Sequence, residues 1–266
     1  MTKPKIIFFG NGPLANYTLN TLQPHFDIIF HARTKEDLET VKTIKVAHPK
    51  AKGILASFGV MIKSDVLDLF EPEGILNIHP SLLPLYRGSS PIESAILNGD
   101  TSFSVSIMKL VKKMDAGPIY YQTTITPTPA NLNRPDLKSY LYQTLAESGA
   151  KWLIENLENL PIPTLQDDKN ATFTTKLDKS MSNLTPNKDT AAQTLRKIQA
   201  FQDFPKPKYT LFGKNCIILE AEPLNQSNTP LLPLKCQDNQ ILSITRLQPE
   251  GKRPMDTKSF LNGYAK

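Results

Sequence analysis

Short apolar runs alternate with amphipathic, helix-forming segments along the first half of the chain, and this alternation limits the fold more than any other feature. The runs predict strands at Lys5–Phe9, Asp27–His31, Gly53–Ser57, Gly74–His79, Phe103–Lys109 and Ile119–Thr126. The segments between and after them predict helices at Pro13–Leu22, Glu36–Val46, Ser64–Phe70, Pro91–Asn98 and Pro135–Leu160. Because strands that alternate with helices form βαβ units, we expect a Rossmann-like α/β fold with a mostly parallel sheet.

The chain changes in character after residue 160. Residues 161–188 are rich in Pro, Thr, Lys, Asp and Asn and show no sustained period, which is typical of a linker. A helix is predicted at Thr190–Phe201, and short strands follow at Tyr209–Phe212, Cys216–Ala221, Leu231–Lys235 and Ile241–Leu247. Evenly spaced short strands favour a small β-barrel or a sandwich, and we expect an OB-like β-barrel. We therefore expect an α/β domain over residues 1–165, a linker over 166–188 and a C-terminal β-barrel domain over 189–266.

The positive charge lies mostly in the last third of the chain. The whole chain has 31 Lys and Arg against 25 Asp and Glu, and residues 181–266 hold 12 of the basic and 7 of the acidic residues. A basic region beside a near-neutral one is typical of a protein that binds a polyanion such as nucleic acid. On charge alone, a lysine-rich surface without such a partner is the favoured interpretation.

Several classes of protein do not fit the sequence. It has no uninterrupted apolar run of the roughly 20 residues that a membrane span needs, and its N-terminal segment lacks a signal-peptide pattern. The two cysteines, Cys216 and Cys236, stand far apart and outside any CxxC motif, which argues against a disulfide scaffold or a structural zinc site. We expect a cytoplasmic protein with no membrane partner and no metal, and cysteines that act as small apolar strand residues.

Gly10, Gly12 and Ala15 follow the first predicted strand with the spacing of a loose dinucleotide-binding fingerprint. The acidic residue that would hold a ribose hydroxyl after the second strand is missing, because that stretch reads His31-Ala32-Arg33. Arg33 would suit a 2′-phosphate, so a dinucleotide-dependent oxidoreductase is one alternative. A tight turn whose glycines let the helix pack is the favoured interpretation.

Polar residues suited to acid–base chemistry lie at the predicted ligand-binding edge of the sheet. Asn77 and His79 are two residues apart at the end of a strand, so both project from one face. Asp115 lies in a turn between two later strands, where it could instead be a simple turn former. If Asp115 reaches His79, the three groups could stabilise an oxyanion and move a proton. Since no Ser or Cys is placed as a nucleophile, attack by a substrate amine on an acyl donor fits better.

Two motifs resemble the folate-dependent formyltransferase family. They are N-I-H-P-S-L-L-P-L-Y-R-G at residues 77–88 and M-D-A-G-P-I at 114–119. Stretches at 171–177, 195–205 and 247–263 resemble the linker and carboxyl domain of those members that act on methionyl-tRNA. The resemblance covers nearly the whole chain, and it implies that Asn77, His79 and Asp115 are the catalytic residues.

The resemblance also implies the ligands. The donor would be 10-formyltetrahydrofolate, and the acceptor would be the amino group of methionine on initiator tRNA. Separately, we expect the protein to be a monomer. Residues expected to contact the folate are Phe58, Gly59, Met61, Ile62, Ser81, Leu82, Leu83, Pro84, Val111 and Met114. Residues expected to contact the tRNA are Arg33, Lys35, Lys42, Arg87, Lys176, Lys179, Lys197, Lys206 and Lys208.

One departure from the family lies after the second strand. Typical members carry a longer, basic, glycine-containing loop there, which reaches the acceptor end of the tRNA, whereas here residues 31–35 run straight into a predicted helix. This leaves the choice among tRNAs open. A formyltransferase acting on an amino sugar nucleotide would keep the same three residues and donor. A non-catalytic RNA-binding module would not need those three residues.

Overall fold

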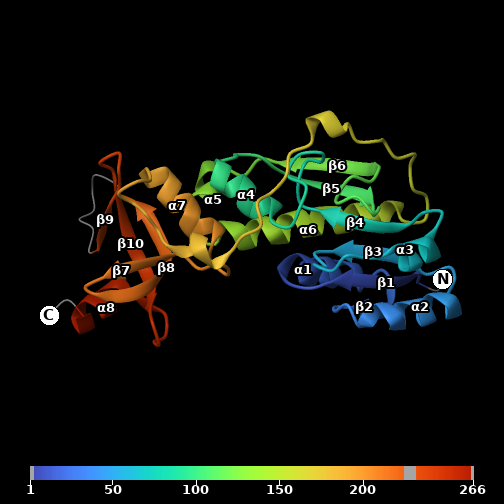
Figure 1. Cartoon of the computed structure of the whole chain (residues 1–266), viewed down its shortest axis with the longest axis horizontal. Helices are drawn as coiled ribbons and strands as arrows, with labels where there is room; N and C mark the ends of the chain where they lie inside the picture. The colour runs from blue at the N-terminus through green and yellow to red at the C-terminus, as the bar shows by residue number, and fades with distance from the viewer. Residues whose placement is uncertain (1–2, 225–231, 265–266) are drawn as a thin grey trace. The chain divides into compact units, whose positions relative to one another are not determined.

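The computed structural model describes residues 3–224 and 232–264 of the 266-residue chain (Figure 1). It forms two compact units. The first consists of residues 1–92, 102–126 and 139–175, and the second of residues 93–101, 127–138 and 176–266. These units differ from the three consecutive parts expected from the sequence. Residues 166–175 pack with the first unit, and the two short segments 93–101 and 127–138 group with the C-terminal residues.

A six-stranded sheet forms the centre of the first unit, in the order β2-β1-β3-β4-β5-β6. Its strands are β1 (Lys5–Gly10), β2 (Asp27–Ala32), β3 (Lys52–Ala56), β4 (Ile75–His79), β5 (Phe103–Lys109) and β6 (Ile119–Ile125). The first four strands in this order are parallel, β5 runs antiparallel to both of its neighbours, β4 and β6, and β6 therefore runs in the same direction as β4. The Rossmann-like, mostly parallel sheet is confirmed.

The helices lie close to their predicted positions. They are α1 (Pro13–Leu22), α2 (Asp37–Ala47), α3 (Ser64–Leu67), the 3₁₀ turn η1 (Asp68–Phe70), α4 (Pro91–Asn98) and α6 (Leu137–Asn156). A short helix, α5 (Pro129–Leu132), precedes α6 and was not predicted. None of the helices among the described residues has the length and apolarity to cross a membrane.

The inner parallel strands β1, β3 and β4 are apolar because they are buried on both faces, whereas the edge strand β2 is only half-buried. Phe9 in β1 is fully buried and packs edge-on against Phe58 and Phe70, with ring centroids 5.7 and 5.9 Å away. The turn after β1 is equally close-packed, since a Cβ at Gly10 would lie 2.4 Å from the carbonyl oxygen of Ala56. Packing therefore accounts for Gly10 without a dinucleotide.

The connection after β2 is short, as the sequence predicted. Residues 33–36 join β2 to α2, and the backbone N–H groups of Arg33 and Thr34 donate to Asp37 Oδ2 at 2.7 and 2.9 Å. These bonds lower the pKa of the Asp37 carboxyl group below its ordinary value. The helix thus begins directly after the strand, and no long loop is present at this place.

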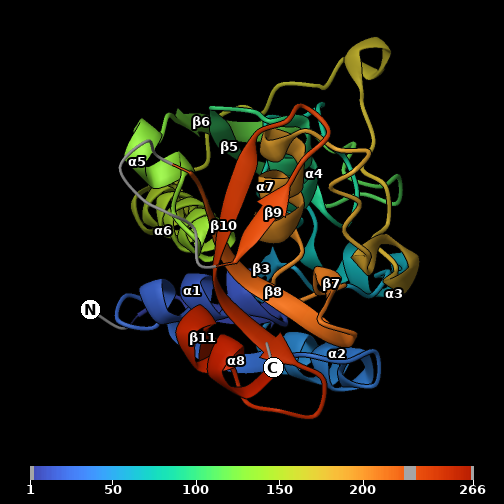
Figure 2. The same cartoon turned by 90° about the vertical axis from the view of Figure 1, so that its left-hand side faces the viewer.

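The second unit contains a curled antiparallel sheet (Figure 2). Its strands are β7 (Lys208–Leu211), β8 (Lys214–Pro223), β9 (Pro233–Lys235), β10 (Ile241–Pro249) and β11 (Met255–Asp256). Helix α7 (Ala191–Ala200) begins with a capping box between Thr190 and Gln193, and α8 (Thr257–Tyr264), which was not predicted, follows the last strand. Leu231, predicted to start a strand, lies outside the described residues.

Cys216 and Cys236 belong to the core of the second unit. Both are buried, and burial raises the pKa of each thiol above its ordinary value. The thiols are therefore protonated at neutral pH and act as small apolar groups, as expected.

Candidate active site

Strand β4 places Asn77 and His79 on one face of the sheet. Asn77 pairs in register with Leu55 of β3 and Met108 of β5, and His79 pairs with Ser106 of β5. Each of the two polar side chains is 5% exposed. Because side chains alternate along a strand, the residue between them, Ile78, faces the opposite side. The sequence prediction that Asn77 and His79 share a face is consistent with this register.

The turn after β5 brings Asp115 to His79. A Cβ at residue 117 would lie 1.8 Å from the carbonyl oxygen of Lys109, so only glycine allows the chain to fold back this closely. Asp115 has a φ of 47°, in the left-handed region. Its Oδ1 lies 3.8 Å from His79 Nδ1, and its Oδ2 accepts a 2.8 Å hydrogen bond from the Gly88 N–H.

The two ring nitrogens of His79 face different groups. Nε2 lies 3.0 Å from the carbonyl oxygen of Tyr86, and because a carbonyl can only accept, Nε2 carries a hydrogen. The other ring nitrogen, Nδ1, faces the Asp115 carboxylate. This arrangement suits a histidine that takes up positive charge during a reaction.

A cavity of about 340 Å³ opens beside these residues. Its walls include Asn77 and Asp115 together with a mostly apolar set: Leu55, Phe58, Gly59, Val60, Met61, Ile62, Gly88, Ser89, Leu110, Val111, Lys112 and Met114. Six of the ten residues predicted to contact a folate are in this set. A cavity of this size with few polar groups is typical of a small-molecule site.

The other four predicted folate contacts, Ser81, Leu82, Leu83 and Pro84, are not among the lining residues. The Ser81 hydroxyl donates to the carbonyl oxygen of Leu85 at 2.7 Å, and the Leu83 N–H donates to Ser106 Oγ at 3.1 Å. These bonds turn the loop inward on itself and against β5. Residues 81–84 shape the loop that follows His79, and the cavity wall takes only the two ends of the motif, Asn77 and Gly88.

Arg87 does not fit its predicted role as a tRNA contact. Its side chain is fully buried; Nε and Nη2 donate to Gln166 Oε1 at 3.1 and 2.7 Å, and Nη1 pairs with Asp168 Oδ1 at 2.8 Å. A guanidinium group held in this way is not available to a phosphate. The sequence could not indicate this, because both partners lie about 80 residues further along the chain.

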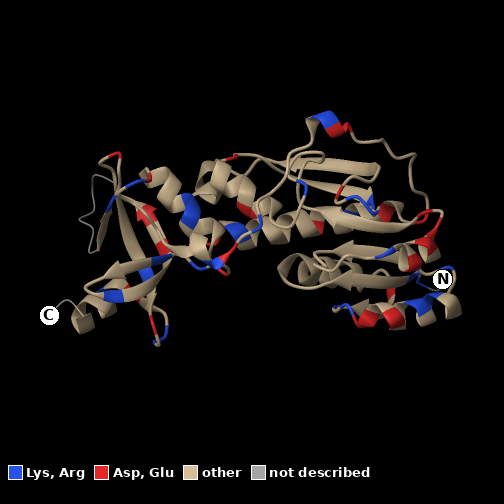
Figure 3. Cartoon of the chain, in the orientation of Figure 1, with Lys and Arg blue, Asp and Glu red and all other residues tan. Residues whose placement is uncertain are grey.

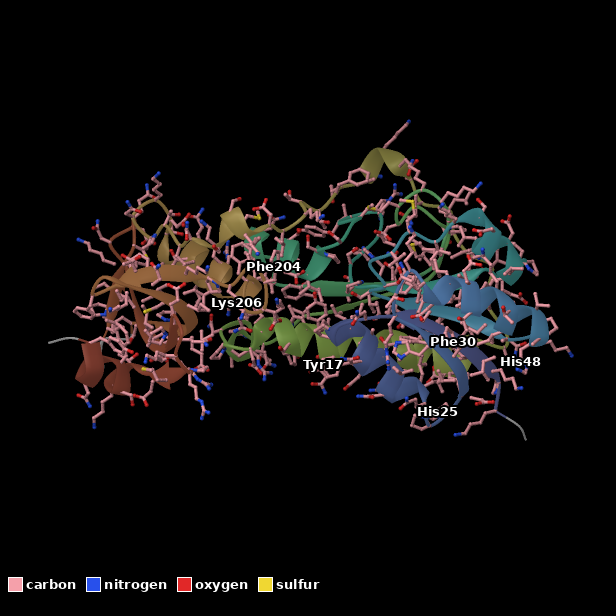
Figure 4. All side chains as sticks on the ribbon, turned by 60° about the horizontal axis from the view of Figure 1, so that its bottom comes forward. Tyr17, His25, Phe30, His48, Phe204 and Lys206 are labelled. Carbon is pink, nitrogen blue, oxygen red and sulfur yellow. The ribbon has the colours of Figure 1, made fainter. Side chains whose placement is uncertain are left out.

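The other predicted tRNA contacts fall into two groups. Lys42 is paired with Asp65 and Glu39, and Lys197 with Asp189. Arg33, Lys35, Lys176, Lys179, Lys206 and Lys208 are exposed. Figure 3 shows basic and acidic residues interspersed along the ribbon of the second unit, and Figure 4 labels Lys206 on the segment between α7 and β7. The exposed lysines are therefore better candidates than the paired ones.

Two family models match the chain, "Formyl transferase" over residues 13–157 and "Formyl transferase, C-terminal domain" over residues 176–265. Methionyl-tRNA formyltransferase from Anaplasma marginale is 33% identical over 221 residues, which cover 79% of this chain and 69% of that protein.

Two solved structures share the fold. HypX from Aquifex aeolicus, in complex with tetrahydrofolic acid, gives a TM-score of 0.71 at 15% identity and covers 100% of this chain, which spans 48% of HypX. WlaRD, a sugar 3N-formyl transferase solved with dTDP and 5-N-formyl-THF, gives 0.62 at 16% identity, with 95% of this chain and 100% of WlaRD covered. At identities of 15% and 16%, these two structures support the fold alone. The two family models and the relative of 33% identity make this chain a member of the formyl transferase family.

Proposed function

We propose that this protein transfers the formyl group of 10-formyltetrahydrofolate to the amino group of methionine on initiator tRNA. The observation that carries the proposal is the apolar cavity whose wall contains Asn77 and Asp115, with His79 facing Asp115. The 33% identity to a methionyl-tRNA formyltransferase supports the same acceptor.

The residues of the cavity fit a reduced folate. Phe58, Ile62 and Val111 offer apolar surface to a flat heterocycle, and the volume of about 340 Å³ is at the low end for small-molecule sites. The rest of a folate would extend toward solvent past Met61 and Met114, which are 76% and 58% exposed. The donor would then present its formyl group to Asn77.

The chemistry follows from the three polar groups. The acceptor amine attacks the formyl carbon, a C–N bond forms, and the carbonyl oxygen becomes an oxyanion that the Asn77 amide stabilises by donating a hydrogen bond. His79 adds positive charge near this oxygen when Nδ1 is protonated. Asp115 takes the proton that the amine loses, and the His79–Asp115 pair returns one to the folate nitrogen as its bond to the formyl carbon breaks.

The acceptor distinguishes this function from its nearest alternative. An amino sugar nucleotide is small and needs no extended basic surface, whereas tRNA gains affinity from many phosphate contacts. Lys176, Lys179, Lys206 and Lys208 are exposed, and no ion pair to them is recorded among the described residues. These lysines support tRNA as the acceptor, and a cytoplasmic location follows from that substrate.

The test is an acceptor panel with purified protein and 10-formyltetrahydrofolate. Methionyl initiator tRNA, methionyl elongator tRNA and a set of amino sugar nucleotides are compared at equal concentration. We expect formylation of methionyl-tRNA above all sugar acceptors. Formylation of a sugar nucleotide alone would overturn the acceptor, and tight NAD(P) binding without folate binding would overturn the reaction itself.

A further inference from the structure

Residues 164–175, which we call the strap, pack against the two loops that carry the catalytic groups. Thr164 and Ile119 exchange two backbone hydrogen bonds of 2.8 Å, which fix one end of the strap beside β6. At the other end, the Arg87 N–H donates to the Thr172 carbonyl oxygen at 2.9 Å, and the Thr174 N–H donates to the Arg87 carbonyl oxygen at 2.8 Å. The sequence pattern predicts a linker here, and the first part of that linker is a fixed element of the first unit.

Gln166 lies at the middle of these contacts. Its Nε2 donates to the carbonyl oxygens of Asp115 and Gly117 at 2.8 and 2.7 Å. Its Oε1 accepts from Nε and Nη2 of the buried Arg87. One amide group therefore joins the turn that carries Asp115 to the loop that carries Tyr86, Arg87 and Gly88.

Both loops contain a residue whose backbone needs such support. Asp115 has a φ of 47° and Tyr86 a φ of 57°, and non-glycine residues in the left-handed region persist where the surroundings hold them. The Asp115 carbonyl is held by Gln166, and the Tyr86 N–H donates to Thr172 Oγ1 at 2.8 Å. The strap thus fixes the two residues whose carboxylate and carbonyl face the two nitrogens of His79.

The side-chain rotamer of Gln166 is fixed by Arg87. Arg87 contributes two donors to one oxygen, which leaves the amide nitrogen pointing at the two turn carbonyls. Asp168 closes the cluster by pairing with both Arg87 and Lys113. A buried guanidinium with this many contacts is pre-organised, so little conformational freedom remains to the amide.

We propose that Gln166 is a positioning residue for formyl transfer, which holds Asp115 against His79 by binding the backbone of the Asp115 turn. The inference rests on the proposed function and adds to it a residue from outside both family motifs. Gln166 does not touch the substrate in this account. It acts through the 3.8 Å separation of His79 Nδ1 and Asp115 Oδ1.

The test compares three variants by kinetics, thermal unfolding and ¹⁵N NMR of the imidazole of His79. Gln166→Ala removes both the bonds to Arg87 and the bonds to the carbonyl oxygens of Asp115 and Gly117. Gln166→Glu keeps an oxygen for Arg87 but has no N–H for the carbonyl oxygens of Asp115 and Gly117. It therefore distinguishes a loss of stability from a loss of the bonds that position Asp115. Asp167→Ala is the matched control, because the Asp167 carboxylate bonds only Lys169 and Asn170 of its own turn among the described residues.

We expect Gln166→Glu to lower kcat by about 10- to 100-fold, as a misplacement of about 1 Å does, while its unfolding temperature stays near that of the wild type. The ¹⁵N signals of His79 should shift in both Gln166 variants and stay in place in Asp167→Ala. Wild-type kcat and unshifted His79 signals in Gln166→Glu would overturn the proposal, as would an equal loss in Asp167→Ala. If the wild type formylates no methionyl-tRNA, the proposed function fails, and the His79 signals still decide the role of Gln166.

Discussion

The candidate catalytic edge of the first unit and the exposed lysines of the second unit use polar side chains in opposite ways. At this edge, Asn77, His79 and Arg87 are buried, and His79 and Arg87 are held by hydrogen bonds that they donate to Tyr86 and Gln166. On the second unit, the candidate tRNA contacts Lys206 and Lys208 are exposed. The difference follows from the chemistry, because proton transfer needs fixed geometry whereas phosphate binding needs charge within reach.

The second unit also contains a buried charge, and it serves a different purpose. Lys138 is 3% exposed, and its ammonium group lies 3.7 Å from Glu93 Oε1 and 3.2 Å from Asp203 Oδ2. This group joins three segments of the second unit and lines no cavity described above. Burial alone therefore does not mark a functional residue, and variants can separate the two kinds of buried group.

The largest expected effect is at the His79–Asp115 pair. His79→Ala and Asp115→Asn should each lower kcat by about 10²–10⁴-fold, because each removes a group that moves a proton in the reaction. Steady-state formylation of methionyl-tRNA measures this. His25→Ala is the matched control, since His25 is exposed on the segment that follows α1 (Figure 4). Near-wild-type kcat in both site variants would refute the assigned roles.

Lys138→Met should show the reverse pattern. This variant keeps the apolar part of the side chain but removes the ammonium group, so the buried Glu93 carboxylate loses its ion pair with Lys138. We expect a loss of about 3 kcal/mol in the free energy of unfolding, measured in denaturant, with kcat per folded molecule unchanged. A lower kcat at full folding would show that this buried charge supports catalysis after all.

A smaller effect is expected from the exposed lysines. Lys206→Ala combined with Lys208→Ala should weaken tRNA binding and reduce the slope of log Kd against log salt by about 1.5, because two phosphate contacts are lost. Lys197→Ala, whose lysine is already paired with Asp189 at 2.6 Å, should leave the slope nearly unchanged. Equal slopes in all three proteins would mean that this surface does not bind tRNA.

The smallest effect concerns pH. Hydrogen bonds from Lys113 and Arg87 hold the pKa of Asp168 below its ordinary value. A lowered carboxyl pKa stabilises the folded state above the unfolded value, and this stabilisation is lost as the pH falls through the folded value. The unfolding temperature of the wild type should therefore exceed that of Asp168→Asn at neutral pH and approach it as the pH falls below the ordinary range of a carboxyl group. A difference independent of pH would contradict the ion pair.

Local patterns predicted the bounds of several elements, including those that carry the candidate site. The bounds of α4 and β5 are those expected; in α4, Pro91 and the Asn98-Gly99 pair are start and stop signals within the helix itself, and in β5 the alternation of residue types marks the strand. The expectation that Asn77 and His79 share one face of the sheet followed from the two-residue period of a strand. Asp115 was singled out through its motif. The sequence could not show that Asp115 lies close to His79, because the two residues are 36 positions apart in the chain.

Contacts between distant segments could not be predicted. Arg87 was taken for a surface cation because its partners, Gln166 and Asp168, lie in a stretch whose composition is that of a linker. Gln166 was missed for the same reason, since nothing within its own neighbourhood points to Asp115. The grouping of residues 127–138 with the C-terminal residues was likewise not predictable. These residues precede α7 by about 50 residues in the chain, and they bond to it through Gln199.

The most direct measurement is single-turnover formyl transfer by wild type and Asn77→Ala, each loaded with 10-formyltetrahydrofolate and mixed with methionyl-tRNA. Asn77 lines the cavity and is the proposed donor to the oxyanion. We predict that Asn77→Ala binds the donor but transfers the formyl group about 10²–10³-fold more slowly than the wild type. Transfer at the wild-type rate by Asn77→Ala would contradict the proposal that this edge of the sheet is the active site.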